Sequence, residues 1–312
     1  MKLFLLGRRH SVNHWLEDAA AAFAAAGHTV AVGHVRRPPI PAGIERALAR
    51  PIGEALAQRI RRIAPDLILC IGGFHAPAAV LAPIAALPGR PPLAGWVGDR
   101  FDDDARGVAD LYDAVGFTDT ALLERHRSLG FRAASLFLPH AADPTGARPA
   151  SEDRRRRMVF IANPTPHRRA VVAAVRQPLT LYGPAWTAED GASHEVHAGR
   201  LAASALPPLY AGHLAALNIR NEINVLSGLN QRNFDPCLAG AALLTDDQPD
   251  LTLCFEPGVE VAVWRDTEEL NDLYDRVLSN PSWAFALGER GRRRVLADHT
   301  FAARLDALKR LI

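Results

Sequence analysis

The sequence predicts an α/β protein built from two parallel β-sheets. Short apolar runs with the character of strands alternate with helical patterns along the whole chain, which is typical of parallel strands joined by helices. The chain has 312 residues. This is too long for one ordinary hydrophobic core, so we expect two domains of roughly 150 residues each. In the most informative stretch, residues 217–264, apolar strand-like runs end in polar residues, as they do where a parallel sheet binds a ligand.

Composition and charge favour a folded cytoplasmic protein. A hydrophobic fraction of 48% with 22% charged residues is typical of soluble globular domains. The net charge of +2 gives no overall field that would attract nucleic acid or a membrane surface. Cys70, Cys237 and Cys254 form no CxxC motif, which argues against a disulfide framework and a zinc site. The apolar run before Gly7 is too short for a signal peptide, and no run approaches the about 18 residues of a membrane span.

The first domain is predicted to contain six strands separated by helices and turns. A helix over residues 13–26 closes at Gly27, one or two helices cover residues 44–63 after a proline-rich turn at 38–41, and another helix ends near Leu129. The predicted strands are residues 3–6, 28–33, 67–71, 93–97, 114–118 and 134–138.

A domain boundary is predicted between Ala141 and Arg157, where Pro, Gly, Ala and charged residues interrupt the apolar pattern. The arginine run at 154–157 either contacts phosphate or is a solvated charged boundary. Beyond it, the predicted strands are residues 158–162, 179–182, 215–219, 241–245 and 259–264, and the predicted helices are residues 167–176, 267–278, 283–297 and 301–312.

The second half resembles a known family in a series of short motifs that keep compatible order and spacing. They are Leu217-Asn218, Asn230-x-Arg232-x-Phe234-Asp235, Ala239-Gly240-Ala241, Leu244-Thr245-Asp246, Phe255-x-Pro257-Gly258-x-Glu260, Glu269-Leu270, Asn280-Pro281, Gly291-x-Arg293 and His299-Thr300-Phe301-x-x-Arg304. On these residues the chain resembles the CgeB-like subgroup of the group 1 glycosyltransferases, within the GT-B superfamily. The first half matches only loosely, at Gly98-Asp99, Thr118-Asp119 and Leu138-Pro139. Asp235 stands where the family usually has glutamate, so a shorter side chain must reach the same group.

This resemblance implies a GT-B-like fold of two Rossmann-like domains with a cleft between them. Residues 1–145 would form the acceptor domain, residues 146–298 the nucleotide-sugar donor domain, and residues 299–312 a C-terminal helix that packs back on the first domain. It implies a metal-independent glycosyltransferase that moves a sugar from a nucleotide-diphosphate sugar to an unknown small molecule, glycan or protein, with no cofactor.

Four polar side chains are the candidate donor contacts. Arg168 falls, with Arg169, in the first turn of a predicted helix, where a cation opposes the helix dipole; either an anionic partner or simple surface exposure explains it. Spacing places Asn230, Arg232 and Asp235 at the end of one helix. The resemblance implies that Arg232 pairs with the diphosphate and that Asp235 accepts hydrogen bonds from a ribose diol. The alternative is a helix cap with an intrahelical Arg–Asp pair.

Gly7 and Gly183 are further candidate donor contacts, because a glycine at a strand end lets a ligand approach the backbone. The residues after Gly7 are Arg8, Arg9, His10 and Ser11, and they do not form the GxGxxG motif of a dinucleotide dehydrogenase. After Gly183, Trp186 either stacks on a base or packs against the next helix.

His75 and Asp99 are the candidate catalytic bases, since each follows a glycine at a predicted strand end. Histidine is the residue type that most often exchanges a proton near neutral pH. The alternative for His75 is a turn residue whose hydrogen bonds are satisfied. Residues 102–104 are three consecutive aspartates, which favour the start of a helix over a metal site, so we expect no metal.

Two other functions stay open at this point. One is a GT-B sugar-nucleotide epimerase or phosphorylase. The other is a catalytically inactive GT-B-fold binding or scaffold protein, which the Asp235 substitution and the loosely matching first half would fit.

Overall fold

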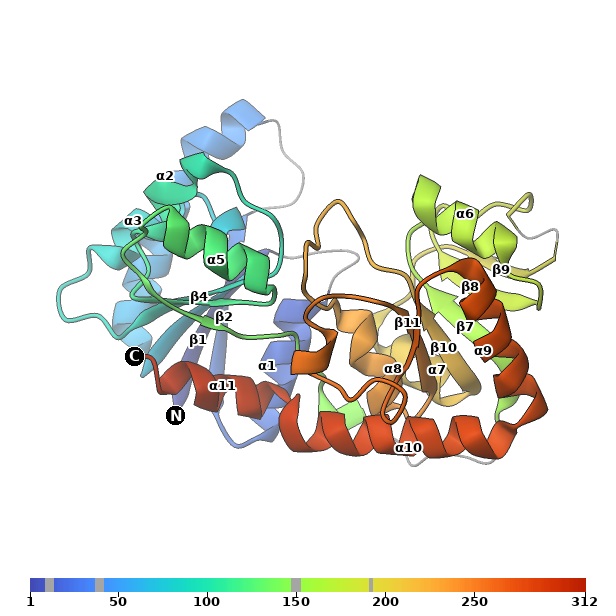
Figure 1. Ribbon diagram of the computed structural model, residues 1–312. Helices are drawn as coiled ribbons and strands as arrows, with labels where there is room; N and C mark the ends of the chain where they lie inside the picture. Colours follow the sequence, from blue (N-terminus) through green and yellow to red (C-terminus); the bar gives the residue numbers. More distant parts are fainter. Residues whose placement is uncertain (9–13, 37–41, 147–152, 191–192) are drawn as a thin grey trace. The chain divides into compact units, whose positions relative to one another are not determined.

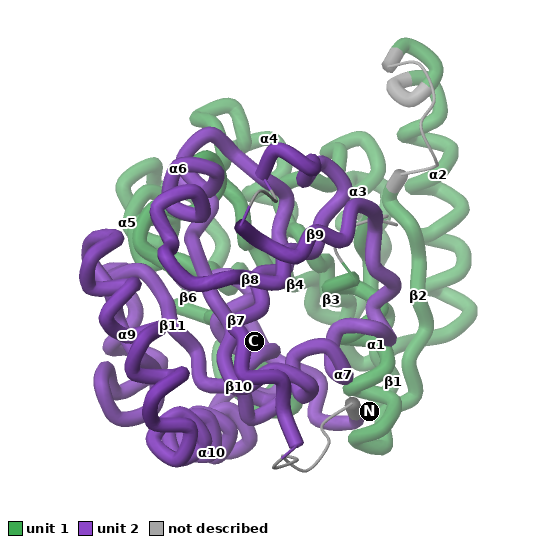
Figure 2. Tube along the Cα trace, turned by 90° about the vertical axis from the view of Figure 1, so that its right-hand side faces the viewer, with its two compact units in different colours: residues 1–139, 223–228, 301–312 green, residues 140–222, 229–300 purple. Residues whose placement is uncertain are grey.

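The computed structural model describes residues 1–8, 14–36, 42–146, 153–190 and 193–312 (Figure 1). Within them the chain divides into two compact units, shown in different colours in Figure 2. The first unit consists of residues 1–139, 223–228 and 301–312, and the second of residues 140–222 and 229–300. The predicted proline-rich turn, residues 9–11 after the first strand and residues 147–152 of the predicted boundary lie outside the described residues.

The described part of the first unit contains a six-stranded parallel sheet in the order β2-β1-β3-β4-β5-β6. Its strands are β1 (Lys2–Arg8), β2 (Thr29–Arg36), β3 (Leu67–Ile71), β4 (Leu93–Val97), β5 (Ala114–Phe117) and β6 (Ala134–Phe137). Its helices are α1 (Trp15–Ala25), α2 (Ala42–Ile63), α3 (Ala78–Ala85), α4 (Arg106–Ala109), α5 (Thr120–Ser128) and α11 (Phe301–Lys309). Every residue of β3 and β4 is buried, as expected for a parallel sheet covered by helices on both faces. The six predicted strands are confirmed.

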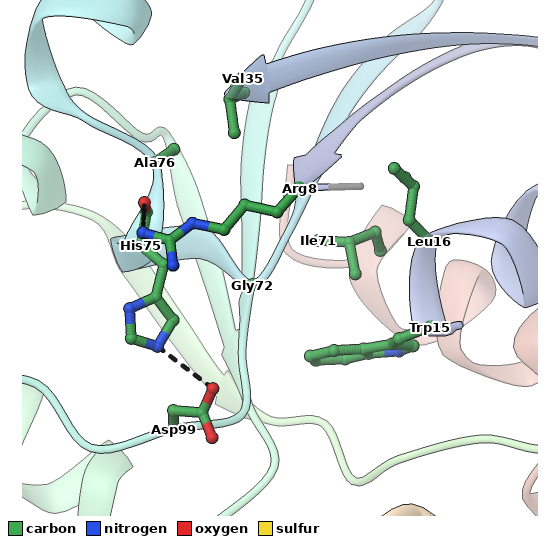
Figure 3. Close-up of a pocket in the computed structure, with 9 residues that line it drawn as sticks. All are labelled: Arg8, Trp15, Leu16, Val35, Ile71, Gly72, His75, Ala76 and Asp99. Carbon is green, nitrogen blue, oxygen red and sulfur yellow. Dashed lines mark hydrogen bonds and ion pairs between the residues drawn. The ribbon is translucent and has the colours of Figure 1, made fainter. Parts of the chain in front are cut away.

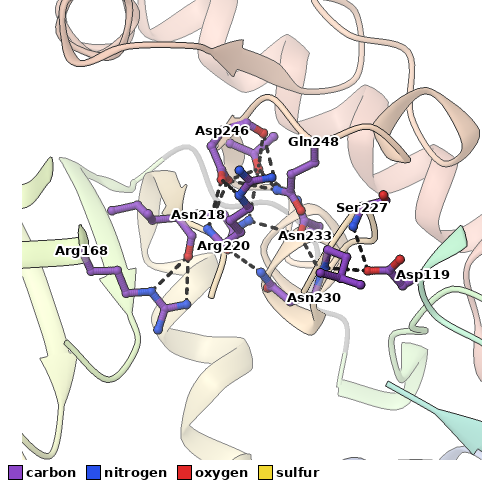
Figure 4. A network of polar contacts seen from close by, with 12 residues as sticks. Asp119, Arg168, Asn218, Arg220, Ser227, Asn230, Asn233, Asp246 and Gln248 are labelled. Carbon is purple, nitrogen blue, oxygen red and sulfur yellow. Dashed lines mark hydrogen bonds and ion pairs between the residues drawn. The ribbon is translucent and has the colours of Figure 1, made fainter. Parts of the chain in front are cut away.

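Two later parts of the chain also belong to the first unit. Phe301, which begins α11, packs edge-to-face against Phe23 and Trp96. In the segment 226–228, three successive backbone N–H groups donate to Asp119 Oδ2 at 2.8, 2.9 and 2.9 Å (Figure 4). Asp119 Oδ1 caps α5 by accepting from Ala121 and Leu122. One buried carboxylate thus holds five backbone donors.

The described part of the second unit contains another six-stranded parallel sheet, in the order β12-β11-β10-β7-β8-β9. Its strands are β7 (Arg155–Ile161), β8 (Leu179–Gly183), β9 (Glu195–Ala198), β10 (His213–Asn218), β11 (Ala242–Asp246) and β12 (Ala262–Trp264). Its helices are α6 (Pro166–Ala174), α7 (Leu206–Ala211), α8 (Asp235–Leu238), α9 (Thr267–Ser279) and α10 (Pro281–Asp298). β12 starts later than predicted because Gly258 N–H donates to Val261 O at 2.7 Å, which closes a turn first.

Three short elements, α3, α7 and β9, have no counterpart in the sequence prediction. The sequence of α3, AAVLAPIA, is apolar on all sides and contains Pro83, so it shows no helical period. β9 has only four residues and is half-exposed at the edge of its sheet. By contrast, residues 44–63 form part of one continuous helix, α2, although Pro51 lies inside it.

His126 is a buried ionisable side chain of the first unit. Neither ring nitrogen has a hydrogen-bond partner among the described residues, and the imidazole packs among Phe74, Phe117 and Phe131. Burial lowers the pKa of His126 from 6.5, and the charge of Arg127 lowers it further, while Asp110 acts in the opposite direction. The unfolded chain therefore binds this proton more readily, so stability falls as the pH drops through 6.5.

We expect His126→Phe to reduce the loss of thermal stability on acidification, because it removes a group that must stay neutral in the folded protein. The measurement is the Tm at about pH 7.5 and about pH 5.0. Each 1 kcal/mol recovered moves the Tm by roughly 2–4 °C in a domain of this size. A matched control is His34→Gln at an exposed position. An equal acid-induced loss in His126→Phe and the parent protein would contradict the assignment.

Candidate functional site

The carboxyl ends of β3 and β4 bring His75 and Asp99 together in the first unit (Figure 3). After β3, Gly72 adopts a φ of 78°, a left-handed conformation that favours glycine, and turns the chain into a short 3-10 segment ending at His75. β4 is the sheet neighbour of β3, and Asp99 follows its end. His75 Nε2 lies 3.1 Å from Asp99 Oδ2, and the side chains are 42% and 43% exposed.

The pair has the geometry of a general base and the carboxylate that orients it. With its proton on Nε2, facing Asp99, His75 keeps Nδ1 as an acceptor, and Nδ1 has no partner among the described residues. An imidazole held in this way can take a proton from a hydroxyl group. The two candidate bases therefore form one pair, and their catalytic role stays a prediction.

A pocket lies beside the pair, lined by residues of β1, α1, β2 and the ends of β3 and β4. Leu16, Val35 and Ile71 give it apolar walls. The Arg8 side chain reaches from the end of β1 toward the His75 turn, and its Nη2 donates to the carbonyl oxygen of His75 at 2.8 Å (Figure 3). The turn that carries His75 is thus attached to a second strand of the same sheet.

Gly7 has a packing reason to be glycine. A Cβ at this position would lie 3.1 Å from Leu16 Cδ2 and 3.3 Å from the carbonyl oxygen of Ile71. The approach of a donor diphosphate to Gly7 stays a prediction. Arg9, His10 and Ser11, noted with it in the sequence, lie outside the described residues.

In the second unit, Arg168 lies beside the carboxyl end of β10. Its guanidinium donates to Asn163 O at 2.9 Å and twice to Ile219 O, at 3.1 and 2.9 Å (Figure 4). Burial, and then the charge of Arg232, lowers the pKa of Arg168 to about 9. The residue is only 3% exposed, so simple surface exposure does not explain this arginine.

Arg232 brings a second guanidinium close enough to repel that of Arg168. Its Nε is buried and has no hydrogen-bond partner among the described residues. Burial lowers the pKa of Arg232, whereas Tyr210, Asp235 and Asp246 raise it. Two like charges that are partly removed from water form a site that an anion would stabilise.

Asn230, Arg232 and Asp235 do not share one helix, so the expectation from their spacing is wrong. Asn230 caps a 3-10 turn over Gln231–Asn233, and α8 begins separately at Asp235. The physical reason is twofold. A capping box between Asn230 and Asn233 closes the 3-10 turn. Pro236, in the first turn of α8, has no N–H group and so cannot extend the hydrogen bonds of that turn into α8.

The side chains of Asn230 and Asp235 are already bonded within the protein. Asn230 Oδ1 accepts from the Arg232 backbone N–H at 2.9 Å, and its Nδ2 donates to Asn218 Oδ1 at 3.2 Å. Asp235 Oδ1 accepts from Gln231 Nε2 at 2.7 Å. The capping role is therefore confirmed for Asn230. Donor contact by Asn230, Arg232 and Asp235 stays a prediction.

Gly183 and Trp186 pack closely against the end of β7. A Cβ on Gly183 would lie 2.2 Å from the carbonyl oxygen of Ala162, so the protein itself requires glycine there. Trp186 Nε1 donates to the same oxygen at 2.7 Å, and the ring is 2% exposed. Trp186 is a packing residue, as one alternative had it, but among the described residues its contacts are with the end of β7 and with Arg169 of α6 and not with the next helix, and its burial argues against base stacking. Gly183 as a donor contact stays a prediction.

Three arginines of the arginine run, and Asp103 of the aspartate run, have partners in the protein. Arg154 is buried and donates to the carbonyl oxygens of Ala239 and Gly240, while Arg155 and Arg157 pair with Glu195. Arg154 is thus neither a solvated boundary charge nor a free phosphate contact. Residues 103–105 begin a 3-10 turn that leads into α4, as the helix-start interpretation predicted.

The second unit gathers five polar residues at the ends of β10 and β11 that the sequence did not single out as site residues, although three of them stand in the motifs: Asn218, Asn233, Thr245, Asp246 and Gln248. All are buried. Burial raises the pKa of Asp246 to about 6. The hydrogen bond from the Arg220 backbone and the charge of Arg220 act in the opposite direction and lower this pKa. The available signal was that apolar strands end in polar residues at Asn218 and Thr245-Asp246.

Among the described residues, no group of three His, Cys, Asp or Glu side chains lies in a position to hold a metal ion. In the same part of the chain, no helix combines the length and apolar character needed to cross a membrane. Cys70, Cys237 and Cys254 are buried, and none of these three described residues forms a disulfide bond.

Two units, each with a six-stranded parallel sheet, match the GT-B fold of known glycosyltransferase structures. The structure matches a sucrose-phosphate synthase from Thermosynechococcus elongatus with a TM-score of 0.70 at 15% identity, covering 99% of this chain and 98% of that chain. It matches HepE from Anabaena in complex with UDP-glucose with a TM-score of 0.71 at 12% identity, covering 99% and 98%. AviGT4, a glycosyltransferase involved in avilamycin A biosynthesis, matches with a TM-score of 0.64 at 15% identity, covering 99% and 96%.

The profile of the family described as glycosyl transferase-like matches residues 155–310, which is half of the chain. The chain therefore belongs to this family. No curated protein sequence matches it. The predicted GT-B fold and glycosyltransferase class are confirmed, and the CgeB-like subgroup stays a prediction.

Proposed function

We propose that the protein is a CgeB-like glycosyltransferase that moves a sugar from a nucleotide-diphosphate sugar to a hydroxyl group of an acceptor. UDP-sugars are the first donors to test, because HepE, which shares the fold, has been solved with UDP-glucose. The observation that carries the proposal is the buried guanidinium group of Arg168 at the carboxyl end of β10, together with the cation of Arg232, whose buried Nε has no partner among the described residues.

The donor diphosphate is the anion that best fits these charges. A guanidinium binds phosphate oxygens through paired N–H groups. The three hydrogen bonds of Arg168 to backbone carbonyls leave some of its N–H groups available for a phosphate. Arg232 supplies a second cation whose Nε is without a partner among the described residues. In this proposal Asp235 accepts from the ribose, and Gly7 and Gly183 lie near the donor.

Transfer requires that the acceptor hydroxyl lose its proton, that its oxygen bond to the anomeric carbon, and that the bond from that carbon to the diphosphate break. We assign the proton to His75 Nδ1, with Asp99 stabilising the imidazolium. Arg168 and Arg232 stabilise the charge that develops on the leaving diphosphate. We therefore propose a reaction that needs neither a metal ion nor a cofactor. Three buried cysteines that form no disulfide bond among the described residues support a cytoplasmic location.

The test is a thermal-shift screen against UDP, GDP, TDP, ADP and their sugar conjugates, in EDTA and in magnesium. A ligand at about 100 times its Kd stabilises by roughly 2.7 kcal/mol. We expect a selective rise in Tm with one nucleotide that EDTA leaves unchanged. A rise that requires magnesium would overturn metal independence. No rise with any nucleotide would overturn the transferase proposal and favour a binding or scaffold protein.

A further inference from the structure

A buried polar network joins the ends of β10 and β11 to the turn that carries Arg232 (Figure 4). At the end of β11, Thr245 Oγ1 accepts from Asn218 Nδ2 at 3.1 Å and from Asn233 Nδ2 at 3.0 Å. Gln248 Nε2 donates to the same oxygen at 3.2 Å. Asn218, Asn233 and Thr245 are all fully buried. The Thr245 hydroxyl is thus the common acceptor of the network.

The network continues into the 3-10 turn. Asn233 Oδ1 accepts from Asn218 Nδ2 at 3.2 Å and from the Asn230 backbone N–H at 3.1 Å. Asn230 Nδ2 donates to Asn218 Oδ1, and Asn230 Oδ1 accepts from the Arg232 backbone N–H. A continuous series of hydrogen bonds therefore runs from Thr245 to the backbone of Arg232.

We propose that Asn218, Asn233 and Thr245 are positioning residues that hold Arg232 for the donor diphosphate. The inference rests on the proposed function, because it requires Arg232 to bind the donor. Arg232 Nε has no hydrogen bond to any described residue. The backbone of the turn therefore fixes the position from which the Arg232 side chain extends. In a water-poor site, the hydrogen bonds of Asn218, Asn233 and Thr245 make that turn rigid, whereas a lost partner leaves buried groups unpaired.

Thr245→Val tests the network, because valine has nearly the shape of threonine but offers no oxygen to Asn218, Asn233 and Gln248. We expect Thr245→Val to weaken binding of the nucleotide selected from UDP, GDP, TDP and ADP about tenfold, the effect of one buried polar group left unpaired. Thr245→Ser keeps the hydroxyl and should restore the affinity. The matched control is Thr180→Val, at another fully buried threonine of the same sheet.

A double-mutant cycle separates positioning of Arg232 from a general loss of stability. The affinity is measured by titration calorimetry in Arg232→Ala and in Arg232→Ala/Thr245→Val. If Thr245 acts through Arg232, the valine has no further effect once the arginine is gone. An equal additional loss in the double variant, or a loss as large in Thr180→Val, would overturn the inference and leave the donor site intact.

The remaining outcomes also decide the question. If Thr245→Val does not fold, Asn230→Ser replaces it, since serine can still cap the Arg232 N–H while losing the amide that donates to Asn218. Unchanged affinity in Asn230→Ser would overturn the inference. If Arg232→Ala binds the nucleotide as tightly as the parent protein, or the parent binds none of the four, the proposed donor site fails and the inference fails with it.

Discussion

Replacing Arg232 with methionine should weaken donor binding without lowering the Tm of the free protein. The guanidinium is desolvated, repels Arg168 and has a buried Nε with no partner among the described residues, so its loss relieves a cost of folding. The bound diphosphate, in contrast, loses charge-assisted hydrogen bonds of about 1.5–3 kcal/mol each, which corresponds to a fall in affinity of about 10-fold to more than 100-fold. Calorimetric titration with the nucleotide, and the Tm without it, are the measurements.

Arg232→Glu should be more severe, because a carboxylate would repel the diphosphate. The matched control is Arg200→Glu, which makes the same charge change at an exposed position of the second unit. If Arg232→Met binds the nucleotide as well as Arg200→Glu does, Arg232 is a structural arginine and the donor site lies elsewhere.

Replacing His75 with glutamine should lower kcat by about 100-fold to 10,000-fold, the usual contribution of a general base. Donor affinity should not change, because the base contacts the acceptor and not the diphosphate. Asp99→Asn should also lower kcat, since an amide does not stabilise an imidazolium and can favour the wrong histidine tautomer. The rate is followed as nucleoside diphosphate released in the presence of acceptor.

His34→Gln, at an exposed position of the first unit, is the control for this pair. A kcat within about threefold of the parent for His75→Gln would remove His75 from the mechanism, since a general base contributes about 100-fold or more. If His75→Gln loses activity but Asp99→Asn keeps it, the histidine is the base and the carboxylate does not orient it.

Most of the fold was visible in the sequence because buried parallel strands are uninterrupted apolar runs. β3 and β4 have the predicted ends, since each run is bounded by residues such as Pro92, Gly72 and Gly98 that stop it. The prediction failed where this contrast is missing. α3 is apolar without a period, and β9 is a short, half-exposed edge strand whose pairing with β8 defines it.

The candidate site was predicted residue by residue, but not as an arrangement. His75 and Asp99 each stood out because a glycine at a strand end precedes them, although 24 residues separate them in the chain. Their contact depends on β3 and β4 being neighbours, which only the sheet order decides. Spacing suggested one helix for Asn230 to Asp235, and the capping box with Pro236 divided it.

By itself, then, the sequence determined the α/β class, the positions of the long strands and helices, and polar strand ends suited to ligand binding, because these depend on local pattern. The tertiary structure decided which polar groups are satisfied. It buried Trp186 and bonded Asn230 within the network, while it left Arg232 Nε without a partner among the described residues. A side chain's hydrogen bonds and loss of water depend on residues distant in the chain, so no local pattern reports them.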